Sequence, residues 1–187
     1  MKAALRERMA RPLPDVSRLQ QLFSLRDGIL IWRERPCSDF QTRDRWLTFN
    51  RRYAKNAAGW RDARGYLQVW ADGKKYWAHR IIFALANGAV PLETEIVDHI
   101  DGNPNNNQPS NLRLADQSKN VSNGKRRKTN RVGFKGVQPS PTVGKFTAQI
   151  TVKGVTYHLG TFLTAEDAHH AYVDASHKLH GDFGRGA

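Results

Sequence analysis

Cysteine is almost absent from this chain of 187 residues, and Cys37 is its single example. One thiol cannot close an internal disulfide or build a cysteine-type zinc site, so stability has to come from burial and hydrogen bonding. Long apolar runs are missing as well: the longest strongly apolar stretch, residues 81–86, is far shorter than the about 20 residues that cross a bilayer. Residues 1–15 are charged and lack the apolar stretch of a secretory signal, so we expect an intracellular protein that is not bound to a membrane.

Acidic side chains are also scarce, and 30 Lys or Arg against 17 Asp or Glu leave a net charge of +13. The imbalance is strongest at residues 117–165, where nine basic residues occur without one acid. A solvated basic face is the alternative, but so long a stretch without acids favours a polyanionic partner. We expect nucleic acid rather than an anionic lipid surface, because no amphipathic basic helix accompanies the charge.

The apolar content, 39% of the residues, is enough for packed cores in one ordinary domain or two small ones. The sequence first predicts a short helix at 16–23, a hairpin closed by Asp27 and Gly28, and irregular structure at 33–63. Periodicity and turn residues then predict further elements: a hairpin over 65–78, a helix over 78–87, strands over 95–99 and 111–114 around an Asn-rich loop, and a short helix over 116–121.

A polar, basic stretch at 124–132 is typical of a linker and predicts a domain boundary. Beyond it, strands over 146–152 and 155–159 alternate apolar and polar residues, and Thr164 opens a helix with an apolar stripe. That helix would cover one face of the sheet and leave the other face open, polar and free of acids. We therefore expect two domains: residues 1–123, with an opening region at 16–64 and a core at 65–123, and residues 133–183.

Four polar residues of the first domain form a pattern that indicates chemistry: Asp98 and His99 are adjacent, Asn111 follows His99 by twelve residues, and Asn120 follows nine residues later. Carboxylate and amide oxygens suit Mg²⁺ or Mn²⁺ with retained waters. A neutral imidazole, with an ordinary pKa of about 6.5, can take a proton from water beside such a metal. Taken singly, each residue could instead be a cap or an ordinary turn former.

This stretch resembles the HNH endonucleases, specifically the phage homing-type subgroup with Asn at the third motif position, and the likeness extends upstream through residues 76–83, 50–55 and 28–32. The resemblance implies a ββα-metal fold in which Asp98 and Asn120 hold the metal, His99 activates water and Asn111 braces the loop. Asn123 would be an accessory residue. His79 and Arg80 begin a helix that the family places beside the site, where they would contact phosphate or serve in packing and capping.

The second domain resembles the APETALA2-type DNA-binding domains, a three-stranded sheet backed by one helix, through Gly133 to Val137, Gly144 to Ile150, Leu159 to Phe162 and the helix end at His180 and Gly181. In that family the open sheet face enters the major groove. The resemblance assigns base contacts to Gln138, Gln149, Thr151, Thr156 and His158, and phosphate contacts to Lys135, Lys145 and Lys153. The linker would add phosphate or minor-groove contacts through Lys125, Arg126, Arg127, Lys128 and Arg131, unless it is only a solvated tether.

Together these observations predict an α+β protein with N-terminal β-hairpins, an HNH nuclease domain and a small three-stranded antiparallel sheet with one helix. The expected function is a homing-type endonuclease that uses one divalent metal, Mg²⁺ or Mn²⁺, and nicks double-stranded DNA as a monomer or weak dimer. By the family resemblance it would act in the cytoplasm of a phage-infected bacterium. The rivals are a catalytically inactive DNA-binding regulator and a structural RNA-binding protein.

Overall fold

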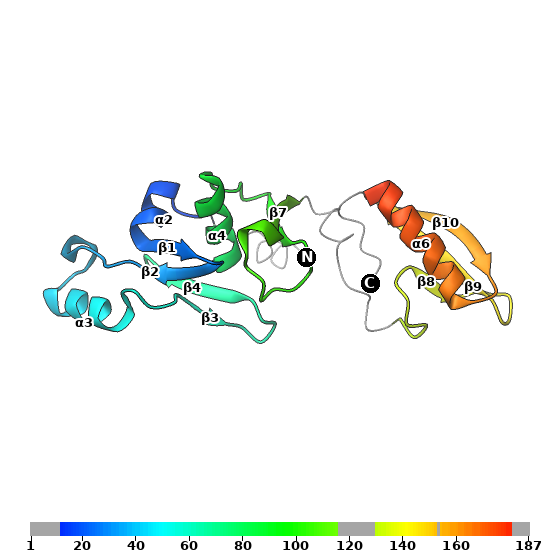
Figure 1. Cartoon of the computed structure of the whole chain (residues 1–187), viewed down its shortest axis with the longest axis horizontal. Helices are drawn as coiled ribbons and strands as arrows, with labels where there is room; N and C mark the ends of the chain where they lie inside the picture. Colours follow the sequence, from blue (N-terminus) through cyan, green and yellow to red (C-terminus); the bar gives the residue numbers. More distant parts are fainter. Residues whose placement is uncertain (1–11, 116–129, 153, 181–187) are drawn as a thin grey trace, which may run out of the picture. The chain divides into compact units, whose positions relative to one another are not determined.

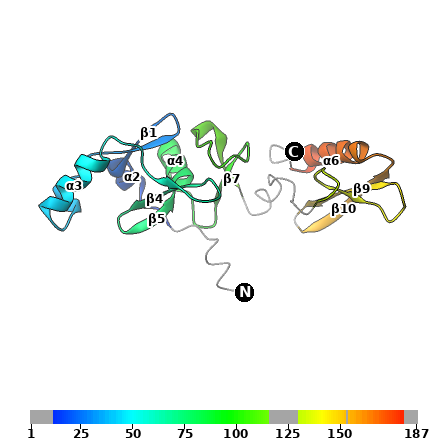
Figure 2. The same ribbon diagram turned by 90° about the horizontal axis from the view of Figure 1, so that it is seen from below.

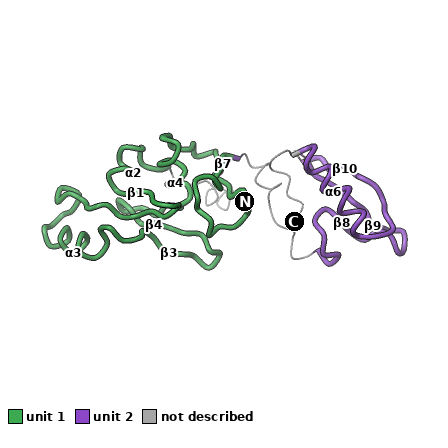
Figure 3. The backbone as a smooth tube through the Cα atoms, in the orientation of Figure 1, with its two compact units in different colours: residues 1–114 green, residues 115–187 purple. Residues whose placement is uncertain are grey.

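The computed structural model describes residues 12–115, 130–152 and 154–180. The chain divides into two compact units, Met1–Leu114 and Ala115–Ala187, which Figure 3 shows in separate colours. The helix predicted at 116–121 and most of the linker predicted at 124–132 lie outside the described residues. The linker boundary therefore stays a prediction. Within the parts that the structure describes, no helix combines the length and the apolar character needed to span a membrane.

Unit 1 opens with a helix and a hairpin, as the sequence predicts (Figure 1). Helix α2 (Val16–Leu22) begins where the side chain of Asp15 accepts a hydrogen bond from the amide of Arg18. Strands β1 (Phe23–Arg26) and β2 (Ile29–Trp32) pair antiparallel around the Asp27–Gly28 turn. Both turn residues have positive φ, which Asp and Gly tolerate better than other residues do.

The prediction of irregular structure at 33–63 is wrong. This region contains a short helix η1 (Cys37–Asp39), an eleven-residue helix α3 (Arg43–Tyr53) and strand β3 (Trp60–Arg61). Thr42 caps α3 by accepting a hydrogen bond from the amide of Arg45. No residue of α3 is fully buried, so its apolar stripe is weak and periodicity does not reveal the helix.

The rest of unit 1 is built around one buried helix, α4 (Ala78–Asn87), which ends at Gly88. Strands β4 (Leu67–Ala71) and β5 (Lys74–Trp77) form the second predicted hairpin, and β4 also pairs with β3. Helix α4 packs against α2 and the strands of both hairpins, and Figures 1 and 2 both place it among these elements. The core that results is one continuous apolar cluster; its fully buried side chains include Leu19, Leu22, Phe23, Leu30, Val69, Ile81 and Ile82.

Strands β6 (Ile96–His99) and β7 (Leu112–Ala115) form a two-stranded sheet beside α4. The chain between them is a loop that ends in a short helix, η2 (Pro109–Asn111). The backbone amide of Ile100 donates to the carbonyl of Asn111, which brings the two ends of the loop together. Both strands agree with the sequence prediction to within one or two residues.

Unit 2 is a three-stranded antiparallel sheet with the order β10-β9-β8, backed by one long helix. The strands are β8 (Val137–Pro139), β9 (Phe146–Val152) and β10 (Val155–Phe162), and the helix is α6 (Ala165–His180). Figure 2 shows α6 lying along one face of the sheet. Apolar side chains of that face, including Val137 and Ala148, pack against Ala165 and Ala168 of the helix. This architecture confirms the alternation read from the sequence, whereas membership of the APETALA2-type family stays a prediction.

Candidate active site

Asp98 and His99 are the last two residues of β6, and both side chains are buried: the residues expose 9% and 4% of their surface. A strand that ends directly before a polar loop places its final side chains at the rim of the core. Burial of two polar groups at that point is unfavourable unless each has a polar partner. The structure supplies a partner for each of them.

The partner of His99 is an amide from the loop. Its Nε2 atom lies 2.9 Å from Oδ1 of Asn107 in a buried hydrogen bond. Aromatic rings enclose the imidazole, with centroid separations of 5.1 Å to His79 and 6.0 Å to Tyr66. The hydrogen bond to Asn107 and the neighbouring rings of His79 and Tyr66 therefore help to hold the ring of His99.

The partner of Asp98 is a cation from the neighbouring strand. Nη2 of Arg113, in β7, lies 3.4 Å from Oδ2 of Asp98, and both side chains are mostly buried. A nearby guanidinium compensates the charge of a carboxylate that is largely removed from water. Sequence reasoning did not single out Arg113, because its role depends on β7 returning beside β6.

Asn111 makes the hydrogen bonds expected of a residue that braces the loop. Its Oδ1 accepts from the amide of Asp101 at 3.1 Å, and its Nδ2 donates to Oδ1 of Asp101 at 3.0 Å and to the carbonyl of Asn106 at 2.8 Å. Burial opposes ionisation of Asp101, but hydrogen bonds from Asn103, Asn106 and Asn111 outweigh it and lower the pKa of its carboxyl group. A direct part of Asn111 in catalysis stays a proposal.

His79 and Arg80, at the start of α4, are both buried. Burial lowers the pKa of His79 to about 3, and the neighbouring His99 and Arg80 act in the same direction. The guanidinium of Arg80 donates to the backbone carbonyls of the α4–β6 connection, those of Pro91, Leu92 and Glu95. These contacts favour the packing role of Arg80 over a phosphate contact.

Asn107 is a site residue that sequence reasoning missed. The run from Asn103 to Asn107 contains four asparagines, each of which fits an ordinary turn. Asn105 accepts a hydrogen bond from Arg61, and Asn106 donates one to Asp101 within the loop. Asn107 instead points inward and contacts the imidazole of His99. No signal in the sequence separates these residues, because the difference arises from the path of the loop.

The metal site predicted from Asp98 and Asn120 can be assessed for one of its two ligands. Asn120 and the accessory Asn123 lie outside the described residues. Among the residues that are described, no three His, Cys, Asp or Glu side chains gather into a group able to hold a metal ion. One buried carboxylate fits Mg²⁺, which commonly binds one or two carboxylates, substrate phosphate and several waters.

The polar side chains predicted to contact DNA lie on one face of the unit 2 sheet. The pairs Thr151–Thr156 and Gln149–His158 are directly opposite each other in the β9–β10 register. The two threonine hydroxyl groups are 2.9 Å apart, and Gln138 Nε2 donates to Gln149 Oε1 at 3.3 Å.

The predicted basic contacts are distributed differently. Lys145 and Arg131 are exposed. Lys135 instead lies at the helix, where its Nζ is 5.9 Å from the ring centroid of Tyr172 in α6. Its predicted phosphate contact stays a prediction. The remaining predicted contacts lie outside the described residues: Lys125, Arg126, Arg127, Lys128 and Lys153.

Residues 76–122 match a family described as HNH endonuclease. An uncharacterized HNH endonuclease of Acanthamoeba polyphaga mimivirus is 33% identical over 113 residues, which cover 60% of this chain and 57% of that protein. Protein 3.8 of Escherichia phage T7 is 34% identical over 107 residues, which cover 57% of this chain and 87% of that protein. The chain thus spans little more than half the length of the mimivirus relative. No solved structure gives a significant match.

Proposed function

The chain belongs to the HNH endonuclease family, and we propose from this that it is a metal-dependent DNA endonuclease in which His99 is the general base. The observation that carries the proposal is the buried imidazole of His99, hydrogen-bonded to Asn107 and adjacent to the buried carboxylate of Asp98. A base that takes a proton from water needs a fixed ring, and a neighbouring carboxylate can hold a cation near the reacting phosphate.

Each residue has a distinct role in this proposal. His99 takes the proton of the attacking water, and Asn111 holds the loop that follows it. Asp98 and Asn120 would hold Mg²⁺ or Mn²⁺, which when bound supplies positive charge against the negative charge that builds on the phosphate and the departing oxygen. Arg113 keeps the carboxylate of Asp98 in place from β7.

Unit 2 would hold the substrate, double-stranded DNA. Support comes from its open polar face and from residues 117–165, which contain nine basic residues and no acid. Lysine and arginine side chains contact phosphates whatever the sequence, whereas glutamine, threonine and histidine on the sheet can reach base edges. With one site per chain, a monomer or weak dimer would nick one strand at each encounter, as expected of a homing-type enzyme.

The test is conversion of supercoiled plasmid with Mg²⁺, with and without EDTA. We expect nicked product only with the metal, and the His99→Ala variant should lose about 10²- to 10⁴-fold in rate. Its affinity for DNA, measured in EDTA, should be unchanged. His170→Ala is the matched control, since His170 is exposed on α6 and should cut normally.

An undiminished rate for His99→Ala would show that the assignment of the base is wrong. A plasmid that is bound but stays supercoiled in both tubes would favour a catalytically inactive DNA-binding regulator. Competition between duplex DNA and structured RNA at one stated salt concentration tests the proposed substrate, and preference for RNA would contradict it.

A further inference from the structure

We infer that one face of the β3–β4–β5 sheet binds an unpaired stretch of DNA by stacking its bases on two exposed tryptophans. The inference rests on the proposed function and specifies its substrate, DNA with unpaired bases near the bond that is cut. Three features of this face carry it: the exposure of its aromatic rings, the positive charge beside them and its contact with the candidate active site.

The register of the three strands brings the tryptophans to one side of the sheet. Gln68 of β4 lies opposite Trp60 of β3 and opposite Trp77 of β5. Trp70 follows Gln68 by two residues in β4 and so points to the same side, as does Lys75, which lies opposite Trp70. These five residues, Trp60, Gln68, Trp70, Lys75 and Trp77, make up what we call the tryptophan face.

The opposite face of the sheet belongs to the core. Val69, Ala71 and Tyr76 alternate with the residues of the tryptophan face, and all three are buried in the cluster that includes helix α4. Two rings of the tryptophan face are instead in contact with water: Trp60 exposes 46% of its surface and Trp70 exposes 58%. Large aromatic side chains exposed next to each other indicate a binding surface.

The spacing of the two rings favours unpaired bases over a duplex. Trp60 and Trp70 are diagonal neighbours on adjacent strands, which places their Cα atoms about 7–8 Å apart. Bases in a duplex follow each other at about 3.4 Å along each strand and present only their edges in the grooves. Bases of an unpaired strand can separate and stack one by one on aromatic rings, whatever their sequence.

The charge beside the tryptophan face suits a phosphate backbone. Lys75, opposite Trp70, is exposed. The guanidinium of Arg64 lies 5.8 Å from the ring centroid of Trp77, and the Arg64 side chain is mostly exposed. Asp62, an acid next to these residues, is 3.4 Å from the same guanidinium, which compensates its charge. Cations next to stacking rings are typical of surfaces that bind single strands.

A second copy of the chain is the alternative occupant of an exposed aromatic face. Each copy carries a net charge of +13, and a two-fold interface through this face would bring the same cations together. Asp72, in the turn at the end of β4, is already paired with Arg18 and Arg35 of its own unit. The charges therefore favour an anionic partner.

The tryptophan face borders the candidate active site. The ring of Tyr66 lies 5.5 Å from that of Trp77 and 6.0 Å from that of His99, measured between centroids. A DNA strand that follows the face to Trp77 thus arrives one aromatic ring away from the proposed base. This continuity connects the recognition of unpaired bases with cleavage.

Tryptophan fluorescence provides a direct measurement of binding to unit 1. All five tryptophans of the chain lie between residues 32 and 77, so this signal comes from unit 1 alone. We expect a short single-stranded oligothymidylate, added to the full chain in EDTA, to quench the fluorescence. Its duplex with oligoadenylate should quench less at equal occupancy. Equal quenching by the two, or none by the single strand, would overturn the inference.

Substitutions at Trp70 separate base stacking from simple apolar contact. Trp70→Ala should raise the Kd for the labelled single strand about 5- to 100-fold, whereas Trp70→Phe keeps an aromatic ring and should stay within a few fold of the unmodified protein. Trp70→Leu keeps an apolar side chain without a ring and should resemble Trp70→Ala. Leu47→Ala is the control, because Leu47 is an exposed apolar residue of α3, and its Kd should be unchanged.

An unchanged Kd for Trp70→Ala, or equal Kd values for Trp70→Leu and Trp70→Phe, would contradict stacking. Trp60→Ala, on the neighbouring strand, gives the answer if Trp70→Ala does not fold. Sedimentation of the same variants tests the alternative: loss of a dimer in Trp70→Ala without loss of affinity for the single strand would assign the face to a second copy.

Lys74 and Lys75 test the phosphate contact. They are adjacent and exposed in β5, but only Lys75 lies on the tryptophan face, because successive side chains alternate. Lys75→Ala should make the slope of log K against log salt shallower by about 0.7 for a single strand. Lys74→Ala is the matched control and should change the slope less. Equal slopes for the two variants would contradict a phosphate contact at Lys75.

Cleavage tests the connection to the reaction. With Mg²⁺, a duplex that contains an unpaired stretch should be cut with a kcat/KM about 10-fold above that of the fully paired duplex, and Trp70→Ala should lose this preference. Equal cleavage of the two substrates by the unmodified protein would overturn the inference and leave the proposed function intact. If the unmodified protein cuts neither substrate, the proposed function fails, whereas quenching and Kd still decide what the tryptophan face binds.

Discussion

His79 lies inside unit 1 with its ring 5.1 Å from that of His99, measured between centroids. Burial lowers the pKa of His79 to about 3, so this imidazole is neutral under ordinary conditions. A neutral neighbour places no like charge beside His99 when that residue takes a proton. The burial and ring contacts of His79 favour the packing role, and a contact with phosphate stays a prediction.

The buried His79 should make stability depend on pH. Its pKa is about 3 when folded and about 6.5 when unfolded, so below pH 6.5 the unfolded chain binds a proton that the folded protein does not. The free energy of unfolding should fall by about 1.4 kcal/mol per pH unit as the pH decreases from about 6 toward 3. Urea denaturation at several pH values measures this slope.

The His79→Phe variant keeps the ring contacts of His79 and should remove this part of the pH dependence. His170→Ala, at an exposed position, should leave the slope as it is in the unmodified protein. An identical slope for His79→Phe and the unmodified protein would contradict the assignment of a neutral, buried His79.

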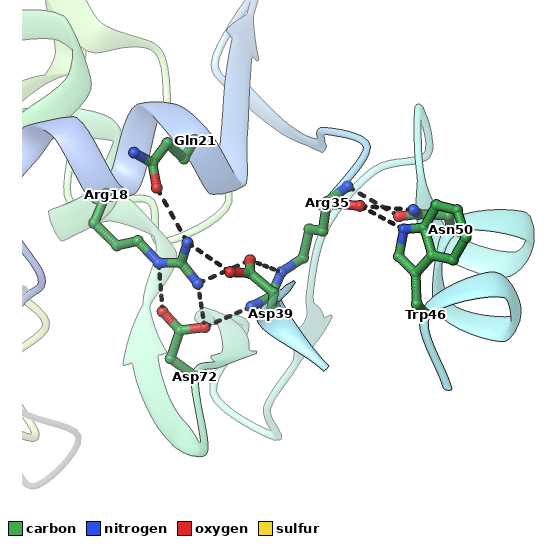
Figure 4. A network of polar contacts seen from close by, with 7 residues as sticks. All are labelled: Arg18, Gln21, Arg35, Asp39, Trp46, Asn50 and Asp72. Carbon is green, nitrogen blue, oxygen red and sulfur yellow. Dashed lines mark hydrogen bonds and ion pairs between the residues drawn. The ribbon is translucent and has the colours of Figure 1, made fainter. Parts of the chain in front are cut away.

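At the scale of elements, a network of two arginines and two aspartates joins α2, η1 and the β4–β5 turn (Figure 4). Arg18 contacts Asp39 and Asp72 at 2.9 Å each, and Arg35 contacts the same two carboxylates at 2.8 Å each. Alternating charges of this kind satisfy all four groups where a single buried pair would leave donors unmatched. The network fixes three segments that are distant in the sequence.

Arg35 also anchors helix α3, which has no fully buried residue of its own. The backbone carbonyl of Arg35 accepts hydrogen bonds at 2.8 Å from Nε1 of Trp46 and from Nδ2 of Asn50, both in α3 (Figure 4). Phe49 adds a ring contact to Trp32 at 5.2 Å between centroids. Side-chain hydrogen bonds thus attach α3 to the rest of unit 1, whereas apolar burial attaches α4.

Removing one carboxylate from the network should be costly. Asp39→Ala leaves the mostly buried Arg35 short of a partner, and we expect a loss of about 2–3 kcal/mol in the free energy of unfolding at pH 7. Asp44→Ala, at an exposed position in the first turn of α3, should lose at most about 1 kcal/mol. Equal losses for the two variants, measured by chemical denaturation, would contradict the role of the network.

The network should also weaken in acid. Burial opposes ionisation of Asp39, but hydrogen bonds from Arg18 and Arg35 outweigh it and lower its pKa. The pKa of Asp72 is lowered chiefly by its hydrogen bond from Arg18. A carboxylate with a lowered pKa stabilises the fold above its unfolded pKa of about 4, and that contribution is lost as the pH falls through the folded value.

In unit 2, Gly136 should be essential for packing of the helix on the sheet. A Cβ at this position would lie 1.9 Å from Cδ2 of Tyr172, a buried residue of α6, and its φ is +75°. We expect Gly136→Ala to destabilise unit 2 by about 2–4 kcal/mol. Gly144→Ala has nearly the same φ, +76°, with nothing within 4 Å of the added Cβ, and should cost less. Equal midpoint temperatures of thermal unfolding for Gly136→Ala and Gly144→Ala would refute this packing argument.

At the scale of the whole molecule, the proposal divides the work between the two units, with chemistry in unit 1 and duplex binding in unit 2. A protein truncated after Gly124 should keep the cleavage reaction and lose affinity. Each phosphate contact contributes about −0.9 to the slope of log K against log salt, so the truncated protein should show a shallower slope. DNA affinity and salt slope equal to those of the full chain would count against unit 2 as the duplex-binding part.

The predictions that succeeded are those that depend on local order. Tight turns at Asp27–Gly28 and Asp72–Gly73, the apolar stripe of α4 and the alternation in β9 and β10 are all encoded within a few residues. Helix α3 escaped prediction because hydrogen bonds to Arg35, outside the helix, hold it in place. The contact between Lys135 and Tyr172 could not be foreseen either, since only the packed unit brings those residues together, and the phosphate contact of Lys135 stays a prediction.

The sequence by itself determined the two hairpins, the buried helix that follows the second hairpin, the adjacent pair Asp98 and His99, and the excess of basic charge, because periodicity, turn chemistry and composition act over short distances. Tertiary structure decided which of several equivalent asparagines reaches His99, which arginine pairs with Asp98, and that the turn at Gly28 lies against the backbone of Asn107. Those contacts join positions far apart in the chain, and burial makes them strong only after the elements have packed.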